Sequence, residues 1–239
     1  MNVQSNVLGK DSVAASKKTK TMPVISASDQ KKMLHKMFAF CCLGAPLLLA
    51  IASFNPGIDS NAASEYFTKF TLGVAPVLGI YAIILFIGVI IAYSNILLPY
   101  KPKVALIACV LGIAGAVGGT NFLTTFSDMS AMMILGVKKE LVLKIDEVLG
   151  VSGLLVKHLI GILFPLSFVL FGIVLARTKL IPLWCGVAVS LFGITFPLGR
   201  IPHIVLIMHL TDLLALISIP WIGIRFLRGD FLDPTEVQK

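Results

Sequence analysis

The chain has 239 residues, of which 57% are hydrophobic and 13% are charged, and its formal net charge is +8. Soluble globular domains are about 45–50% apolar and about 25% charged. This composition excludes disordered, collagen-like, coiled-coil and disulfide-framework proteins, and it predicts an integral membrane protein.

Six apolar runs are long enough to cross a hydrocarbon core about 30 Å thick, and without water each must cross as a helix. The predicted spans are 37–54, 72–98, 104–126, 149–176, 180–198 and 201–227. We therefore expect an all-α bundle of six transmembrane helices in residues 31–228. A disordered basic cytoplasmic tail (1–30) would precede it, and a short cytoplasmic tail (229–239) would follow.

Two predictions concern the first span: where its helix begins, and whether the span is kept or cleaved as a signal peptide. Residues 28–36 begin with capping-type residues, so we expect the first helix to begin there, before the membrane. Ala50-Ile51-Ala52 looks like a signal-peptidase site, but 36 residues before the apolar run are too many for an ordinary signal peptide. We predict that this span is retained.

The basic residues predict the orientation. Residues 1–36 hold seven lysines and two acids, and the two short loops on the same side carry Lys101 and Lys103, then Arg177 and Lys179. Under the positive-inside rule both termini lie in the cytoplasm. We expect the N-terminal lysines to contact anionic lipid headgroups, and because no nucleic-acid-binding motif is present, we expect no nucleic-acid partner.

The loop between the third and fourth spans ends in an amphipathic segment, 138–149. Leu141, Ile145 and Val148 share one helical face, and Glu140 and Lys144 form an i,i+4 pair on the helix. Two readings stay open: an interfacial helix on the outer face, or an exposed N-terminal extension of the fourth span.

The glycines, cysteines and prolines inside the spans are interpreted as helix-packing and helix-breaking residues, not as catalytic or ligand-binding residues. Gly115 and Gly119 form a GxxxG pattern, which lets two membrane helices approach closely. The cysteines match no zinc or redox spacing and are interpreted as buried hydrophobes. Five prolines fall within spans and are expected to remove helix hydrogen bonds: Pro46, Pro76, Pro165, Pro197 and Pro220.

Ionisable groups inside the spans are the functional candidates, because burying them in a bilayer is costly. His209 and Asp212 lie three residues apart on one helical face, and His158 falls at a similar predicted depth in another span. These three residues form the candidate intramembrane polar site. Arg200 and His203 are candidates for its outer mouth.

Three interpretations of these groups stay open. They form a protonatable site of a small-solute or proton-linked transporter, or hydrogen bonds within a non-catalytic assembly or stability factor. In a third interpretation His158 and His209 are haem ligands of a redox protein. The chain has no soluble-type catalytic motif and no metal-ligand spacing, so we predict no catalytic residues, no metal site and no resident cofactor other than that haem alternative.

The last third of the chain resembles multi-pass inner-membrane proteins of bacteria that have no known activity. The stretches that carry the resemblance are Gly161-Ile-Leu-Phe-Pro-Leu, Phe171-Gly-Ile-Val-Leu-Ala-Arg-Thr-Lys-Leu-Ile-Pro-Leu-Trp184, Phe196-Pro-Leu-Gly-Arg-Ile-Pro202 and Thr211-Asp-Leu-Leu-Ala-Leu216. The resemblance implies a multi-helix membrane fold and a bacterial inner-membrane location, and it implies no activity.

Overall fold

The structure is a computed structural model that describes residues 26–53, 74–137, 141, 144, 160–200 and 204–231. Its regular elements are all helices: α1 (Ala27–Ser53), α2 (Ala75–Leu97), α3 (Pro102–Ile134), α5 (Ile160–Arg177), α6 (Leu183–Arg200) and α7 (Val205–Arg228). Each is long and apolar enough to span a membrane. The prediction of an all-α bundle of six transmembrane helices is confirmed.

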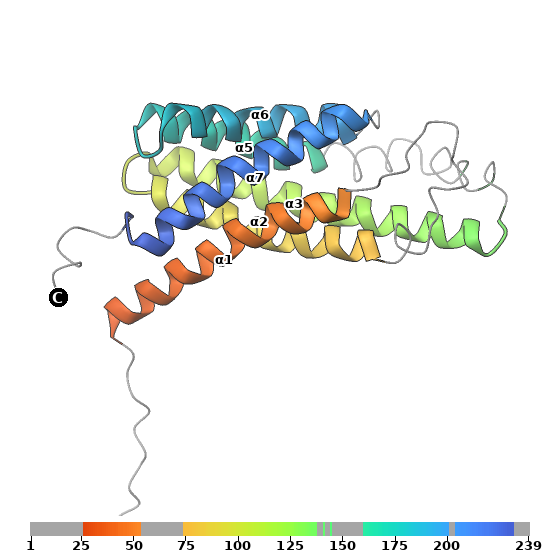
Figure 1. Cartoon of the computed structure of the whole chain (residues 1–239), viewed down its shortest axis with the longest axis horizontal. Coiled ribbons are helices and arrows are strands. Elements are labelled where there is room, and N and C mark those ends of the chain that lie inside the picture. The colour runs from red at the N-terminus through yellow and green to blue at the C-terminus, as the bar shows by residue number, and fades with distance from the viewer. Residues whose placement is uncertain are drawn as a thin grey trace, which may run out of the picture.

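The six helices form a closed ring. Neighbours along the chain pack against each other, and the ring closes because α1 packs against α7. Successive helices run in opposite directions, so α1 begins at the same end of the bundle where α7 ends (Figure 1). The described chain therefore has both of its ends on one side of the membrane.

That same end collects most of the described basic residues. They lie in the first turns of α1, in the α2–α3 and α5–α6 turns and at the end of α7: Lys31, Lys32, Lys36, Lys101, Lys103, Arg177, Lys179, Arg225 and Arg228. This grouping is what the positive-inside rule expects of a cytoplasmic end.

The helix termini refine several predicted boundaries. α1 begins at Ala27, so residues 27–30 belong to a helix and not to the tail; the Ser26 hydroxyl accepts a hydrogen bond from the Asp29 backbone N–H at 3.2 Å and caps the helix. Pro76 lies in the first turn of α2, where no backbone hydrogen bond is lost, so the prediction that it removes one is wrong. The other four prolines lie inside helices, as predicted.

The α5–α6 turn explains why the fifth helix begins three residues later than expected. Lys179 has a left-handed backbone (φ 57°), and the Leu180 N–H donates to the Leu175 carbonyl at 3.1 Å, which ends α5. Gly229 ends α7 with the same backbone geometry. Residues 180–182 therefore belong to the turn.

The outer loop is only partly described. Within the predicted amphipathic segment the structure describes Leu141 and Lys144, both helical and exposed, and the rest lies outside the described residues. α3 continues past the predicted end of its span to Ile134 and reaches beyond the ends of its neighbours (Figure 1).

Small residues set the distance between α3 and α5. A Cβ at Gly115 would overlap the backbone nitrogen of Phe164, and one at Gly118 would lie 3.0 Å from the Gly161 nitrogen. A Cβ at Gly119, however, would meet Ile83 of α2 at an ordinary 3.4 Å. The prediction of glycine-mediated packing is correct, but the close contact with α5 uses Gly115 and Gly118 and not the Gly115–Gly119 pair.

Aromatic rings fill the interior between α2, α5 and α6. Phe86 of α2 lies 5.7 Å from Phe168 and 5.8 Å from Phe192, measured between ring centroids, and all three side chains are fully buried. Cys41, Cys42 and Cys185 are also buried as free thiols, which agrees with their interpretation as hydrophobes. Aromatic side chains thus form the core of the ring, which also contains the fully buried side chains of Tyr93 and Ser167.

Candidate functional site

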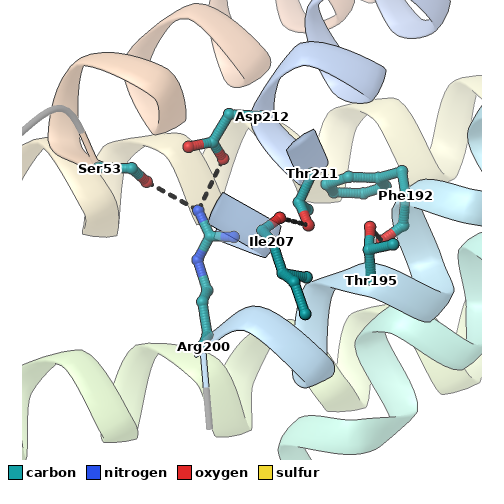
Figure 2. A network of polar contacts seen from close by, with 7 residues as sticks. All are labelled: Ser53, Phe192, Thr195, Arg200, Ile207, Thr211 and Asp212. Atoms are coloured by element: carbon teal, nitrogen blue, oxygen red, sulfur yellow. Dashed lines mark hydrogen bonds and ion pairs between the residues drawn. The ribbon is translucent and has the colours of Figure 1, made fainter. Parts of the chain in front are cut away.

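A largely buried polar contact joins three helices at the end of the ring opposite the basic turns. Arg200 is the last residue of α6, and its Nη2 donates to Asp212 Oδ1 of α7 at 2.8 Å. The same Nη2 donates to the hydroxyl of Ser53, the last residue of α1, also at 2.8 Å (Figure 2). We call Arg200, Asp212 and Ser53 the Arg200 site.

The ion pair is largely removed from solvent. The side chain of Asp212 is 6% exposed and that of Arg200 is 18% exposed. The guanidinium carbon of Arg200 lies 4.4 Å from the centroid of the Phe196 ring, one turn earlier on α6. This cation–π contact stabilises the charge on its apolar side.

Among the described residues, each charged group leaves one polar atom without a hydrogen bond. Arg200 Nη1 and Asp212 Oδ2 are both buried and have no partner in this part of the chain. Arginine and carboxylate often pair through two parallel hydrogen bonds, but here each uses one of its two equivalent atoms. The site therefore holds an unused donor and an unused acceptor.

The local sequence explains why Asp212 points inward. The buried positions of α7 include Asp212, Ala215, Ile219 and Ile222, spaced three or four residues apart as one helical face requires. Asp212 lies seven residues after Val205, which places it roughly 10 Å along the helix axis from that end. It is therefore an acid within the membrane-spanning part of the helix.

Two neighbouring threonines do not compete for the site. The Thr211 hydroxyl donates to the Ile207 carbonyl at 2.7 Å (Figure 2). The Thr195 hydroxyl donates to the Leu191 carbonyl at 2.8 Å. Such bonds to the preceding turn satisfy the hydroxyl proton within its own helix.

The candidate site residues that were predicted from the sequence differ in burial and in their contacts. Asp212 is buried, whereas His209 occupies an exposed position on α7. Arg200, assigned to the outer mouth, is the ion-pair partner of Asp212. His158 and His203 lie outside the described residues, so a meeting of His158 with His209 and Asp212 stays a prediction.

Sequence reasoning missed the Arg200–Asp212 pair although the signal was present. The candidate site rested on i,i+3 spacing within one helix and on equal predicted depth in two spans, and neither criterion relates Arg200 to Asp212. Arg200 and Asp212 flank the α6–α7 connection, and antiparallel neighbours bring such residues together across the turn. Ser53 gave no signal, because its contact depends on α1 closing the ring.

Other buried polar side chains lie at a distance from this site along the bundle. His35 of α1 is 3% exposed and packs edge-on against Phe226, 5.2 Å between ring centroids. Tyr93 is fully buried, and its hydroxyl has no hydrogen-bond partner within the described residues. In the described parts of the chain, no three His, Cys, Asp or Glu side chains lie close enough together to hold a metal ion.

No protein-family model, curated protein or solved structure matches this chain.

Proposed function

We propose that this multi-pass membrane protein is a transporter that binds a small polar solute at the Arg200 site. The observation that carries the proposal is the buried Arg200–Asp212 pair with one unpartnered nitrogen and one unpartnered oxygen. A charge inside a membrane helix costs about 2.5–3.5 kcal/mol on insertion scales. A pair kept only to hold helices together would be expected to use all of its hydrogen-bonding capacity.

The position of the site fits this role. Ser53, Arg200 and Asp212 come from three helices that meet where the ring closes between α1 and α7. Solutes in membrane proteins commonly bind between helices, at groups left unsatisfied within the bundle. We infer that the basic end of the ring faces the cytoplasm, with its lysines near anionic headgroups, and that the Arg200 site opens toward the other side.

Solute-driven swelling of proteoliposomes tests the proposal without knowledge of the substrate. Vesicles would be mixed with a panel of small solutes: short carboxylates, amides, polyols, amino acids and alkylamines. The matched control is the double variant Arg200→Gln/Asp212→Asn, which removes both charges of the pair, keeps a polar side chain at each position and leaves the net charge of the protein unchanged.

We expect at least one solute class to swell wild-type vesicles faster than vesicles with the double variant. Equal swelling for every solute, with both proteins folded, would exclude transport through this site. It would favour the alternative in which the pair is a structural element of an assembly factor.

A further inference from the structure

The charge balance of the Arg200 site restricts what it can bind. A guanidinium stays protonated at all physiological pH values, whereas a carboxyl group can take up a proton. Arg200 and Asp212 together are neutral while Asp212 is ionised. When Asp212 takes up a proton, the buried guanidinium loses its counter-charge, which is costly in a low-dielectric interior.

Among the described residues, Arg200 is the charged group that contacts Asp212. Asp212 accepts a hydrogen bond from the guanidinium of Arg200 on α6. The same guanidinium links Asp212 to the hydroxyl of Ser53 on α1. On α7 itself the nearest titratable residue is His209, one turn earlier and at an exposed position. Protonation of Asp212 therefore acts first on Arg200.

The fork of Arg200 matches a planar anion with two oxygens. Among the described residues, Arg200 Nη1 has no hydrogen-bond partner. Once Asp212 is neutral, Arg200 Nη2 can exchange its hydrogen bond with Asp212 for one with a bound anion. Two parallel N–H···O bonds to a carboxylate are the strongest arrangement that a guanidinium makes. The Ser53 hydroxyl, which accepts from Nη2, also carries a proton that a bound oxygen can accept.

We propose that the site binds one small monocarboxylate together with one proton. The carboxylate takes the place of Asp212 on Arg200, and the proton, from bulk water, binds to Oδ2 of Asp212. Before binding, one cation and one anion give zero net charge; afterwards the cation, the solute anion and the neutral acid again give zero. This proposal rests on the proposed transport function and adds the class of solute and its coupling to protons.

Proton binding and anion binding are linked: if a bound proton raises the affinity for the anion, a bound anion raises the affinity for the proton by the same factor. This linkage makes the proposal measurable. Binding of formate and lactate to the purified protein would be measured from the shift in thermal unfolding at pH 5.5 and pH 8. Formamide and lactamide serve as neutral counterparts, propylammonium as a cation, and chloride as an ionic-strength control.

We expect at least one of the two carboxylates to bind about 300-fold more tightly at pH 5.5 than at pH 8, a difference of ~3.4 kcal/mol, because uptake of one proton per anion changes the affinity about tenfold for each pH unit. Asp212→Asn, which mimics the protonated acid, is expected to bind tightly at both pH values. Arg200→Gln is expected to lose at least tenfold in affinity. Asp230→Asn removes the exposed partner of Arg225 and should retain the wild-type pH dependence.

A measurement on the unaltered protein covers the case in which a variant fails to fold. Adding the carboxylate to weakly buffered wild-type protein is expected to take up about one proton for each anion bound. Uptake of no proton, or equal affinity at both pH values, would overturn the proposal.

The outcomes separate the two proposals. If only an amide or propylammonium binds, and the double variant Arg200→Gln/Asp212→Asn abolishes it, the solute site stands and the carboxylate class is wrong. If no member of the panel binds and none swells proteoliposomes, both proposals fail.

Discussion

Replacing Asp212 by Asn is expected to lower the free energy of unfolding by about 3 kcal/mol, because it leaves the Arg200 guanidinium without a counter-charge. Arg200→Gln is also expected to be destabilising, because it leaves the buried Asp212 carboxylate without a counter-charge. The measurement is equilibrium unfolding in mixed micelles with increasing denaturing detergent.

The double variant Arg200→Gln/Asp212→Asn separates the pair from the single residues. We expect it to be more stable than the sum of the single losses implies, with a coupling energy of about 2 kcal/mol. The Arg225–Asp230 pair provides the control, because its side chains are 26% and 35% exposed. Its coupling is expected to stay below about 1 kcal/mol. Equal coupling for both pairs would mean that burial of the Arg200–Asp212 pair has no energetic consequence.

Replacing Gly115 by Ala is expected to cost about 3 kcal/mol, because the new Cβ would overlap the backbone of Phe164. A side chain can rotate away from such a contact, but a backbone nitrogen cannot. α3 and α5 would have to separate, and the aromatic core beside them would lose packing. The same unfolding measurement tests this expectation.

Gly161→Ala is the matched control, because no atom lies within 4 Å of the Cβ it would add. This substitution is expected to leave stability unchanged or to raise it by up to about 1 kcal/mol through helix propensity. If Gly115→Ala behaved like Gly161→Ala, the close approach of α3 to α5 would be wrong.

Sequence reasoning recovered the fold because bilayer thickness imposes a simple rule on apolar runs. Its errors lie at helix ends, where single residues decide. Pro76 begins α2 instead of interrupting it, and Lys179 ends α5 through a left-handed backbone that lysine seldom adopts. Hydropathy carries no information about either position.

The site was only partly predictable. Asp212 stood out because an acid inside a membrane helix is rare. Its pairing with Arg200 depends on the order of helices around the ring, and the contribution of Ser53 depends on the closure between α1 and α7. Helical periodicity shows which residues share a face of one helix, but it does not predict which helices pack against each other.

The proposed transport requires that solutes reach the Arg200 site from the side of the membrane opposite the basic end. Labelling of a Ser53→Cys variant in right-side-out vesicles tests it most directly, with an anionic, membrane-impermeant thiol reagent. The wild-type protein gives the background, since Cys41, Cys42 and Cys185 are buried and Cys109 is half-buried. A Lys103→Cys variant marks the basic end.

We predict that the cysteine at position 53 reacts from outside, and that it reacts more slowly when Arg200 is replaced by Gln, because the guanidinium attracts the anionic reagent. The cysteine at position 103 should react only when the inner face is opened. Reaction at position 53 only from the inner face, or only after unfolding, would contradict the account.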